Sequence, residues 1–322
     1  MAVQFVLPDG KSLSQPPSVA TYAVDRTVFV AAAIGALAII ALVVYILWEI
    51  GGQALPAIGR SGAAFLVDTR WDVQNESFGI LPQIWGTLYS SLLALLIGGF
   101  VGITIAIFLT QDFLPHRIAV VFRTLIEMLA AIPSVVFGLW GIFVVIPFIR
   151  PAANWLYDTA GFIPFFGTSL SGPGLAPAVI VLAIMILPTI TAISQDAIGL
   201  VPYKIKEAAY GMGTTRWEAI LKVIVPTASG GIFSALILGF GRALGETMAL
   251  AMLIGNANQI SLSLFSPANT LASLLASNFP EAGQSERQAL MYAALVLLAI
   301  TLVVNVIGTL ILVWTSRNMA KT

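Results

Sequence analysis

The stretch GRALGETMA, residues 241–249, places Arg242 and Glu246 four positions apart, and no other charge occurs between Lys222 and Glu281. Side chains four apart share one face of an α-helix, so the spacing predicts an ion pair. A guanidinium can also bind two oxygens of a tetrahedral oxyanion at once. Two interpretations follow. The pair is structural and holds helices together, or Arg242 binds an anion in transit while Glu246 holds or releases it.

The composition limits the kinds of chemistry available to the chain. Of 322 residues, 58% are hydrophobic and 9% are charged, whereas soluble domains average about 25% charged. The chain is therefore an integral membrane protein. It has one histidine, His116, and no cysteine, which excludes disulfides and leaves no basis for a His/Cys metal site. No Walker A pattern occurs, so we expect no ATP hydrolysis, and no metal or cofactor, on this chain.

A membrane-spanning helix needs about 20 mostly apolar residues. Six segments meet this requirement: residues 27–48, 84–109, 124–149, 174–194, 227–254 and 289–314. The first is too long for the core of a signal peptide, so we expect a retained anchor. Pro188 predicts a kink in the fourth segment, and residues 49–76 are expected to form a long outer loop.

The distribution of lysine and arginine indicates the orientation. With six spans, ten of the 15 basic residues fall on the face that carries both termini, and four fall on the other face. Positive charge is enriched in cytoplasmic loops. Both termini are therefore expected in the cytoplasm, and lone His116 is expected on the surface of a basic loop.

Arg242 lies deep in the fifth segment. If that helix begins near Pro226, Arg242 is about 24 Å along it. An arginine at the centre of a span costs about 2.5–3.5 kcal/mol, so such a charge suggests a function. Gly241, Gly245 and Ala249 form a row of small residues that favours close helix packing. We expect this face to meet protein or a wet pathway rather than lipid.

The third segment has two further polar features. Glu127 lies four residues after Arg123, so an ion pair at the helix end is the simplest interpretation, and a role in the pathway is the alternative. Pro133 and Ser134 are expected to break or bend this helix. Backbone N–H groups freed at the break could face an anion.

The loop at residues 196–222 has a clear local pattern. Pro202 suits the start of a helix over 203–212, and Gly213 suits its end. Thr215 and Glu218 then form a T-x-x-E capping box for a second helix. The loop is therefore predicted to be helix, glycine turn, helix. It is either a docking element with a small-residue face or a plain helical hairpin at the membrane surface.

The loop resembles the EAA loop of ABC importer permeases. Glu207, Ala208 and Ala209 are followed by three residues and then Gly213, and nine residues later comes Val-x-Val-Pro, where the family usually has Ile-x-Leu-Pro. The resemblance implies that this loop is a coupling helix, seated in a cleft of a cytoplasmic ATPase subunit. By the same resemblance, these four residues belong to that contact.

Other stretches resemble the phosphate-specific permeases of the PstC type. They are GILPQIWGTLYSS (79–91), IEMLAAIPSVVFGLWG (126–141), GRALGETMA (241–249) and TLASLLASNFPEA (270–282). The family implies an all-α type I ABC importer permease in the bacterial inner membrane. It also implies a PstA-type second permease, a PstB-type ATPase dimer that uses ATP, and a periplasmic PstS-type phosphate-binding protein. Arg242 and Glu246 match residues implicated in transport.

We therefore expect five parts: a cytoplasmic segment (1–26), a first transmembrane helix (27–48), an outer loop (49–76), a permease core (77–317) that contains the coupling loop (196–222), and a cytoplasmic tail (318–322). The expected function is the pore of an ATP-driven phosphate importer that works by alternating access. The alternatives are a permease for sulfate or molybdate, a secondary anion transporter that works alone, and a scaffold or sensor. A secondary transporter would need more carboxylates in the spans and usually has internal repeats, and a scaffold leaves Arg242 unexplained.

Overall fold

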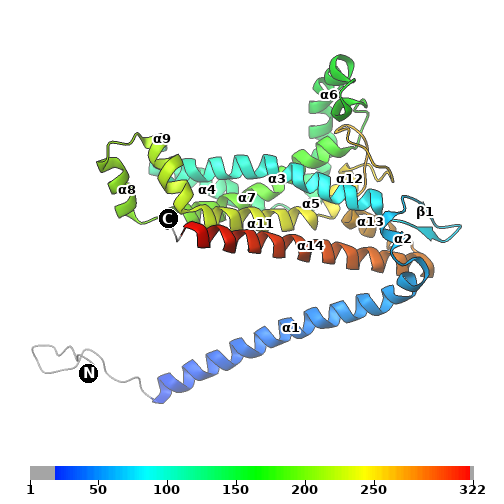
Figure 1. The fold of residues 1–322 in the computed structure, drawn as a ribbon, viewed down its shortest axis with the longest axis horizontal. Coiled ribbons are helices and arrows are strands. Elements are labelled where there is room, and N and C mark those ends of the chain that lie inside the picture. The colour runs from blue at the N-terminus through cyan, green and yellow to red at the C-terminus, as the bar shows by residue number, and fades with distance from the viewer. Residues whose placement is uncertain (1–18, 320–322) are drawn as a thin grey trace, which may run out of the picture. The chain divides into compact units, whose positions relative to one another are not determined.

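The computed structural model describes residues 19–319, and most of them are helical (Figure 1). The helices are α1 (Val19–Ser61), α2 (Ala64–Val67), α3 (Leu81–Thr110), α4 (His116–Ala130), α5 (Ser134–Trp140), η1 (Gly141–Val145), α6 (Ile146–Ala160), η2 (Pro164–Phe166), α7 (Leu175–Gly199), α8 (Tyr203–Gly211), α9 (Arg216–Ala219), η3 (Ile220–Ile224), α10 (Val225–Thr227), α11 (Ser229–Leu244), α12 (Met248–Leu253), α13 (Leu271–Asn278) and α14 (Gln284–Met319). Strands β1 (Trp71–Asp72) and β2 (Ser77–Phe78) form an antiparallel hairpin. Residues 1–18 of the expected N-terminal segment and 320–322 of the expected tail lie outside the described residues.

The first compact unit, Met1–Gly52, is represented by most of α1. Its apolar side chains are exposed along the helix, as suits a surface in contact with lipid. The expected helix over 27–48 is too short, and the expected loop over 49–76 is wrong in its first part, because α1 continues to Ser61. Helix α1 continues through Pro56 and ends just before Gly62, whose φ of 49° gives the left-handed turn that closes many helices.

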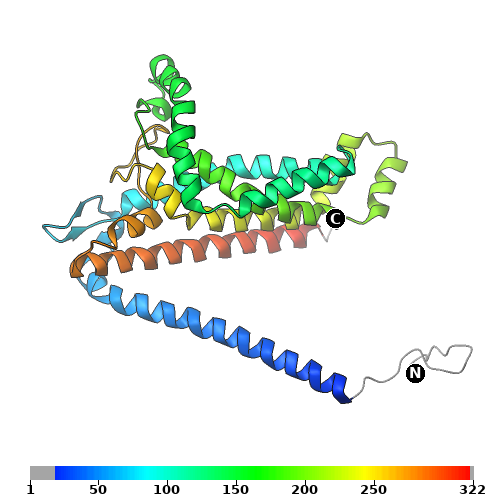
Figure 2. The same ribbon diagram turned by 180° about the vertical axis from the view of Figure 1, so that it is seen from behind.

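The second unit, Gln53–Thr322, is a bundle in which α3, α7, α11 and α14 lie side by side (Figures 1 and 2). Its main core is formed mostly by α7, together with residues of α3, α5, α11 and α12. Glycines allow the close approach there. A Cβ at Gly98 would lie 2.8 Å from the Ala183 carbonyl oxygen, and one at Gly239 would lie 2.7 Å from the Ile190 side chain. The close packing thus uses other glycines than the predicted row on the fifth segment.

The expected six spans correspond to five long apolar helices and one bent pair. In the bent pair, residues 216–227 meet α11 at an angle of 70°. Helix α11, the second member of this pair, begins at Ser229 and ends at Leu244 rather than at the expected residue 254. Gly245 weakens the helix, and the Thr247 hydroxyl donates to the Gly245 carbonyl at 3.0 Å, which competes with helical hydrogen bonds.

The limits of the third span also differ from the expected 124–149. The long apolar run is Ser134–Ala160, and α4 is a separate amphipathic helix before it. The predicted break at Pro133 is confirmed, because residues 131–133 are not helical. Proline lacks the N–H that would continue the helix, and it disfavours helical backbone at the residue before it.

The two ends of the bundle carry different structures (Figures 1 and 2). Helices α8 and α9 form a hairpin at one end, hereafter the α8–α9 hairpin. The β1–β2 hairpin and α13 lie at the opposite end, where Arg60 and Glu76 form an ion pair at 3.7 Å. The bundle thus separates its two ends by the length of the spanning helices.

Candidate functional site

Arg242 lies in the last turn of α11 and reaches the neighbouring helix α7. Its Nη1 donates to the Thr189 hydroxyl oxygen at 3.0 Å, and the side chain is otherwise exposed. Among the described residues, no carboxylate lies within ion-pair distance of Arg242. The second unit therefore presents an unneutralised guanidinium on an exposed face of a spanning helix, which is a suitable anion site.

The predicted ion pair between Arg242 and Glu246 is wrong for this structure. The prediction assumed one continuous helix, but α11 ends at Leu244, so the two side chains do not share a helical face. Glu246 instead accepts a hydrogen bond from the Ala249 backbone N–H at 3.2 Å, in the first turn of α12. A carboxylate at this position satisfies an orphan donor and suits the positive end of the helix dipole.

The predicted ion pair between Arg123 and Glu127 is confirmed at 3.8 Å. Arg123 also lies 3.9 Å from Asp196 near the end of α7. A cavity of about 100 Å³ lies beside these groups, between α4 and α7, with Thr191 and Ala192 in its wall. The cluster connects α4 to the segment of α7 that leads into the α8–α9 hairpin.

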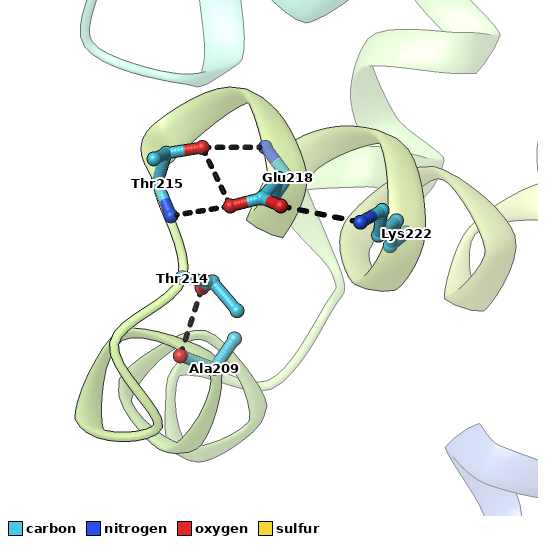
Figure 3. A network of polar contacts seen from close by, with 5 residues as sticks. All are labelled: Ala209, Thr214, Thr215, Glu218 and Lys222. Atoms are coloured by element: carbon cyan, nitrogen blue, oxygen red, sulfur yellow. Dashed lines mark hydrogen bonds and ion pairs between the residues drawn. The ribbon is translucent and has the colours of Figure 1, made fainter.

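The α8–α9 hairpin has the predicted local structure (Figure 3). Helix α8 ends at Gly211, and Gly213 has φ of 83°. Thr215 and Glu218 form the capping box: the Glu218 carboxylate accepts from the Thr215 N–H at 3.0 Å, and the Glu218 N–H donates to the Thr215 hydroxyl at 3.4 Å. Hydrogen bonds from the Thr215 backbone and hydroxyl, and the neighbouring Lys222, lower the pKa of Glu218 to about 2.

The four residues expected at the ATPase contact lie together on this hairpin. Glu207 and Ala208 are exposed on α8, whereas Ala209 is buried against the rest of the hairpin. The Ala209 carbonyl accepts from the Thr214 hydroxyl at 2.8 Å, which ties α8 to the turn at Gly213 (Figure 3). Ala209 and Gly213 thus shape the hairpin, while Glu207 and Ala208 face outward.

Sequence reasoning missed how the hairpin is held to the bundle. The Arg216 guanidinium lies 4.0 Å from the centroid of the Phe113 ring and donates to the Gln111 carbonyl. Phe113 also packs against Trp217 at 5.1 Å between ring centroids. A basic residue beside an aromatic one in the same loop was the available signal, but Phe113 is about 100 residues away in sequence.

Sequence reasoning also missed Thr189. It lies on α7, 53 positions before Arg242, and no local pattern connects the two. Pro188 was noted only as a kink. The contact depends on how α7 and α11 pack together, and that packing is not a property of either segment alone.

The bundle of spanning helices with a capped hairpin at one end is the fold of type I ABC importer permeases, as two comparisons show. Residues 102–321 match the family described as "Binding-protein-dependent transport system inner membrane component". The solved structure of a bacterial alginate ABC transporter, in complex with its periplasmic protein, contains a chain of similar fold. Its TM-score is 0.62 at 16% identity, over 92% of this chain and 97% of that chain.

Curated relatives give a closer match. A PstC phosphate transport system permease protein of Haemophilus influenzae is 40% identical over 90% of this chain and 93% of its own length. One from Mesorhizobium japonicum is 39% identical over 95% of each chain. The chain therefore belongs to the inner membrane components of binding-protein-dependent transport systems and, within them, to the family of the PstC permeases.

Proposed function

We propose that this chain is the pore-forming permease subunit of an ATP-driven importer of inorganic phosphate, working by alternating access. The relatives are named phosphate transport system permease proteins and cover nearly the whole chain. The observation that carries the proposal is the Arg242 guanidinium, exposed on a spanning helix with Thr189 as its only described side-chain partner. A cation of this kind, costly in a membrane, suits a tetrahedral oxyanion in transit.

The proposal gives Arg242 and Glu246 separate roles. In this structure Glu246 is held by the backbone of α12, so Arg242 is open to an anion. If α11 and α12 straighten during the cycle, Glu246 would come one helical turn from Arg242 and compete with the bound anion. Exchange between the two partners would let the site bind phosphate in one state and release it in another.

The remaining parts of the transporter belong to other chains in this proposal. A PstA-type permease pairs with this one, a PstS-type protein delivers phosphate from the periplasm, and a PstB-type ATPase dimer binds and hydrolyses ATP. This chain is a transport subunit rather than an enzyme, and it binds no cofactor of its own. Its place is the bacterial inner membrane, with both termini in the cytoplasm.

The α8–α9 hairpin is the proposed contact with the ATPase. Its outward side exposes Glu207 and Ala208 together with the apolar side chains of Tyr203 and Met212, which are 73% and 86% exposed. Apolar residues this exposed at one end of a membrane protein suit a protein partner. The capping box and Gly213 hold the hairpin in one shape, so that a movement of the partner displaces it as a unit.

Uptake of labelled phosphate, sulfate and molybdate tests the proposal, in cells that lack their own phosphate permease and express this chain with all its partners. Arg242→Gln should abolish phosphate uptake with assembly unchanged. Arg117→Gln removes the same charge from an exposed position on α4 and should leave uptake intact. Full uptake by Arg242→Gln would make Arg242 structural. Uptake of sulfate or molybdate in place of phosphate would assign another oxyanion, and uptake without the ATPase would indicate a secondary transporter.

A further inference from the structure

Thr189 differs from most threonines in the helices of this chain. Threonines in helices commonly donate their hydroxyl proton to the carbonyl four residues earlier. Nine described threonines do so here: Thr27, Thr87, Thr104, Thr110, Thr124, Thr159, Thr227, Thr301 and Thr309. The Thr189 hydroxyl instead accepts from Arg242, and no described residue accepts the Thr189 proton.

This arrangement leaves a hydrogen-bond donor beside a cation. A hydroxyl can accept one hydrogen bond and donate another at the same time. Since its oxygen is engaged by the Arg242 Nη1, the remaining capacity of Thr189 is to donate. The guanidinium has further N–H groups that no described residue accepts. The two side chains thus offer several donors and a positive charge at one place, and their common complement is an anion with more than one oxygen.

Thr189 lies on the same face of α7 as part of the wall of the cavity near Arg123. Thr189, Ala192 and Asp196 are spaced by three and four residues, so they follow one face of α7. Ala192 and Asp196 line the cavity of about 100 Å³ beside Arg123. A single water needs only about 10–15 Å³, so this cavity admits polar contents. This face of α7 runs from Thr189 to Asp196, toward the hairpin end, over about 10 Å.

The Asp196 end of this face does not offer the same chemistry as the Thr189 end. There Arg123 is already engaged by Glu127 and Asp196 at 3.8 and 3.9 Å. Two carboxylates around one guanidinium give a negative surplus, which opposes a second stable anion site. The open donors are concentrated at Thr189 and Arg242.

We propose that Thr189 is a substrate-contacting residue: its hydroxyl oxygen orients the Arg242 guanidinium, and its hydroxyl proton bonds an oxygen of the transported oxyanion. The inference deepens the proposed function and rests on it. The site then binds the anion through two kinds of hydrogen-bond donor: the charged guanidinium of Arg242 on α11 and the neutral hydroxyl of Thr189 on α7.

Three variants of the full chain separate this role from a structural one. Thr189→Val keeps the shape of the side chain but removes its hydroxyl, and Thr189→Ser keeps the hydroxyl. Thr104→Val is the matched control. Its hydroxyl bonds only the Phe100 carbonyl of its own helix, at 2.7 Å, and it is exposed on α3.

The complete transporter would be reconstituted in vesicles and supplied with phosphate-loaded binding protein. Uptake of labelled phosphate and hydrolysis of ATP would be measured together. Thr189→Val should lower uptake about tenfold, the effect of a lost hydrogen bond to a charged ligand. Stimulated hydrolysis should persist, because the hairpin is unchanged. Thr189→Ser should recover most of the uptake, and Thr104→Val should match the intact chain.

The outcomes distinguish this inference from the proposed function. Normal uptake by Thr189→Val, a parallel loss of uptake and hydrolysis, or failure of Thr189→Ser to recover uptake would each overturn the inference while phosphate import by the intact chain stands. If the intact transporter imports no phosphate, the proposed function fails and this inference fails with it.

Discussion

The α8–α9 hairpin and the Arg242 region differ in how their polar groups are satisfied. At the hairpin, the Glu218 carboxylate accepts hydrogen bonds from Thr215 and from Lys222 in η3, all within eight residues of sequence. At the end of α11, Arg242 reaches a residue 53 positions away and keeps most of its donors free. The polar groups of the hairpin are thus satisfied by neighbouring residues, whereas the Arg242 guanidinium keeps N–H donors available for a ligand.

This difference matches the work proposed for each region. A contact that transmits movement benefits from a fixed shape, and internal hydrogen bonds that need no partner provide one. A site that binds and releases an anion must leave donors unused between cycles. Unsatisfied polar groups are costly within a membrane, so their presence points to a ligand.

The largest expected effect comes from reversing one charge in each region. Arg242→Glu should lower phosphate uptake about a hundredfold or more, because it replaces attraction to the anion by repulsion at short range. Lys222→Glu should change uptake less than about threefold, because Lys222 is 72% exposed and its pair with Glu218 is an ordinary surface salt bridge. Equal effects in uptake assays would remove the contrast between the regions.

Substitutions at Glu246 should have the next largest effect. They distinguish the role of its negative charge from the role of its hydrogen bond at the start of α12. Glu246→Ala removes the acceptor for the Ala249 N–H and should destabilise the start of α12 by about 1 kcal/mol. Glu246→Gln keeps an acceptor oxygen and removes the charge. We expect both to lower uptake, but only Glu246→Ala to lower the thermal stability of the purified complex. Unchanged uptake by Glu246→Gln would leave Glu246 with the cap alone.

Two neighbouring glycines test the rigid shape of the hairpin. Gly213→Ala should cost about 1–2 kcal/mol, because φ of 83° is unfavourable for a residue with a Cβ, although space is open around it. Gly211→Ala is the control, since it is helical and equally unobstructed. Binding of the purified ATPase subunit should weaken up to about tenfold for Gly213→Ala only. If both bind equally well, hairpin shape does not limit coupling.

The smallest effect concerns pH at the capping box. The folded pKa of Glu218, about 2, lies below its ordinary value of 4.5. The stability that its ionised form contributes is therefore present above about pH 4.5 and is lost as pH falls through about 2. The difference in ATPase binding between the intact chain and Glu218→Gln should be constant from pH 5 to 8. If this difference in binding changes between pH 5 and 8, a group other than Glu218 controls the pH dependence.

Sequence alone predicted the features that depend on near neighbours. The capping box at Thr215 and Glu218, the left-handed Gly213, the pair of Arg123 with Glu127 and the break at Pro133 all follow from rules that span four residues or fewer. The number of spans followed from hydropathy, which also acts locally.

The features that sequence reasoning missed depend on packing between distant segments. The ion pair of Arg242 and Glu246 was inferred from a helical spacing, but the helix ends between them at Gly245. The contact of Thr189 with Arg242 can be recognised only in the structure, where α7 packs beside α11. The glycines that allow this approach, such as Gly239 against Ile190, are meaningful only once the facing helix is known.

The 70° bend near Ala228 gives the second unit a mechanical property. The arm from Arg216 to Thr227 is about 17 Å long, and α11 from Ser229 to Arg242 is about 20 Å long. If the two segments rotate together about this bend, the displacement at one end and the displacement at the other are nearly equal, because the two segments have nearly equal lengths. A displacement of the hairpin by a few ångströms would therefore reach Arg242 with nearly the same size, turned toward a different direction.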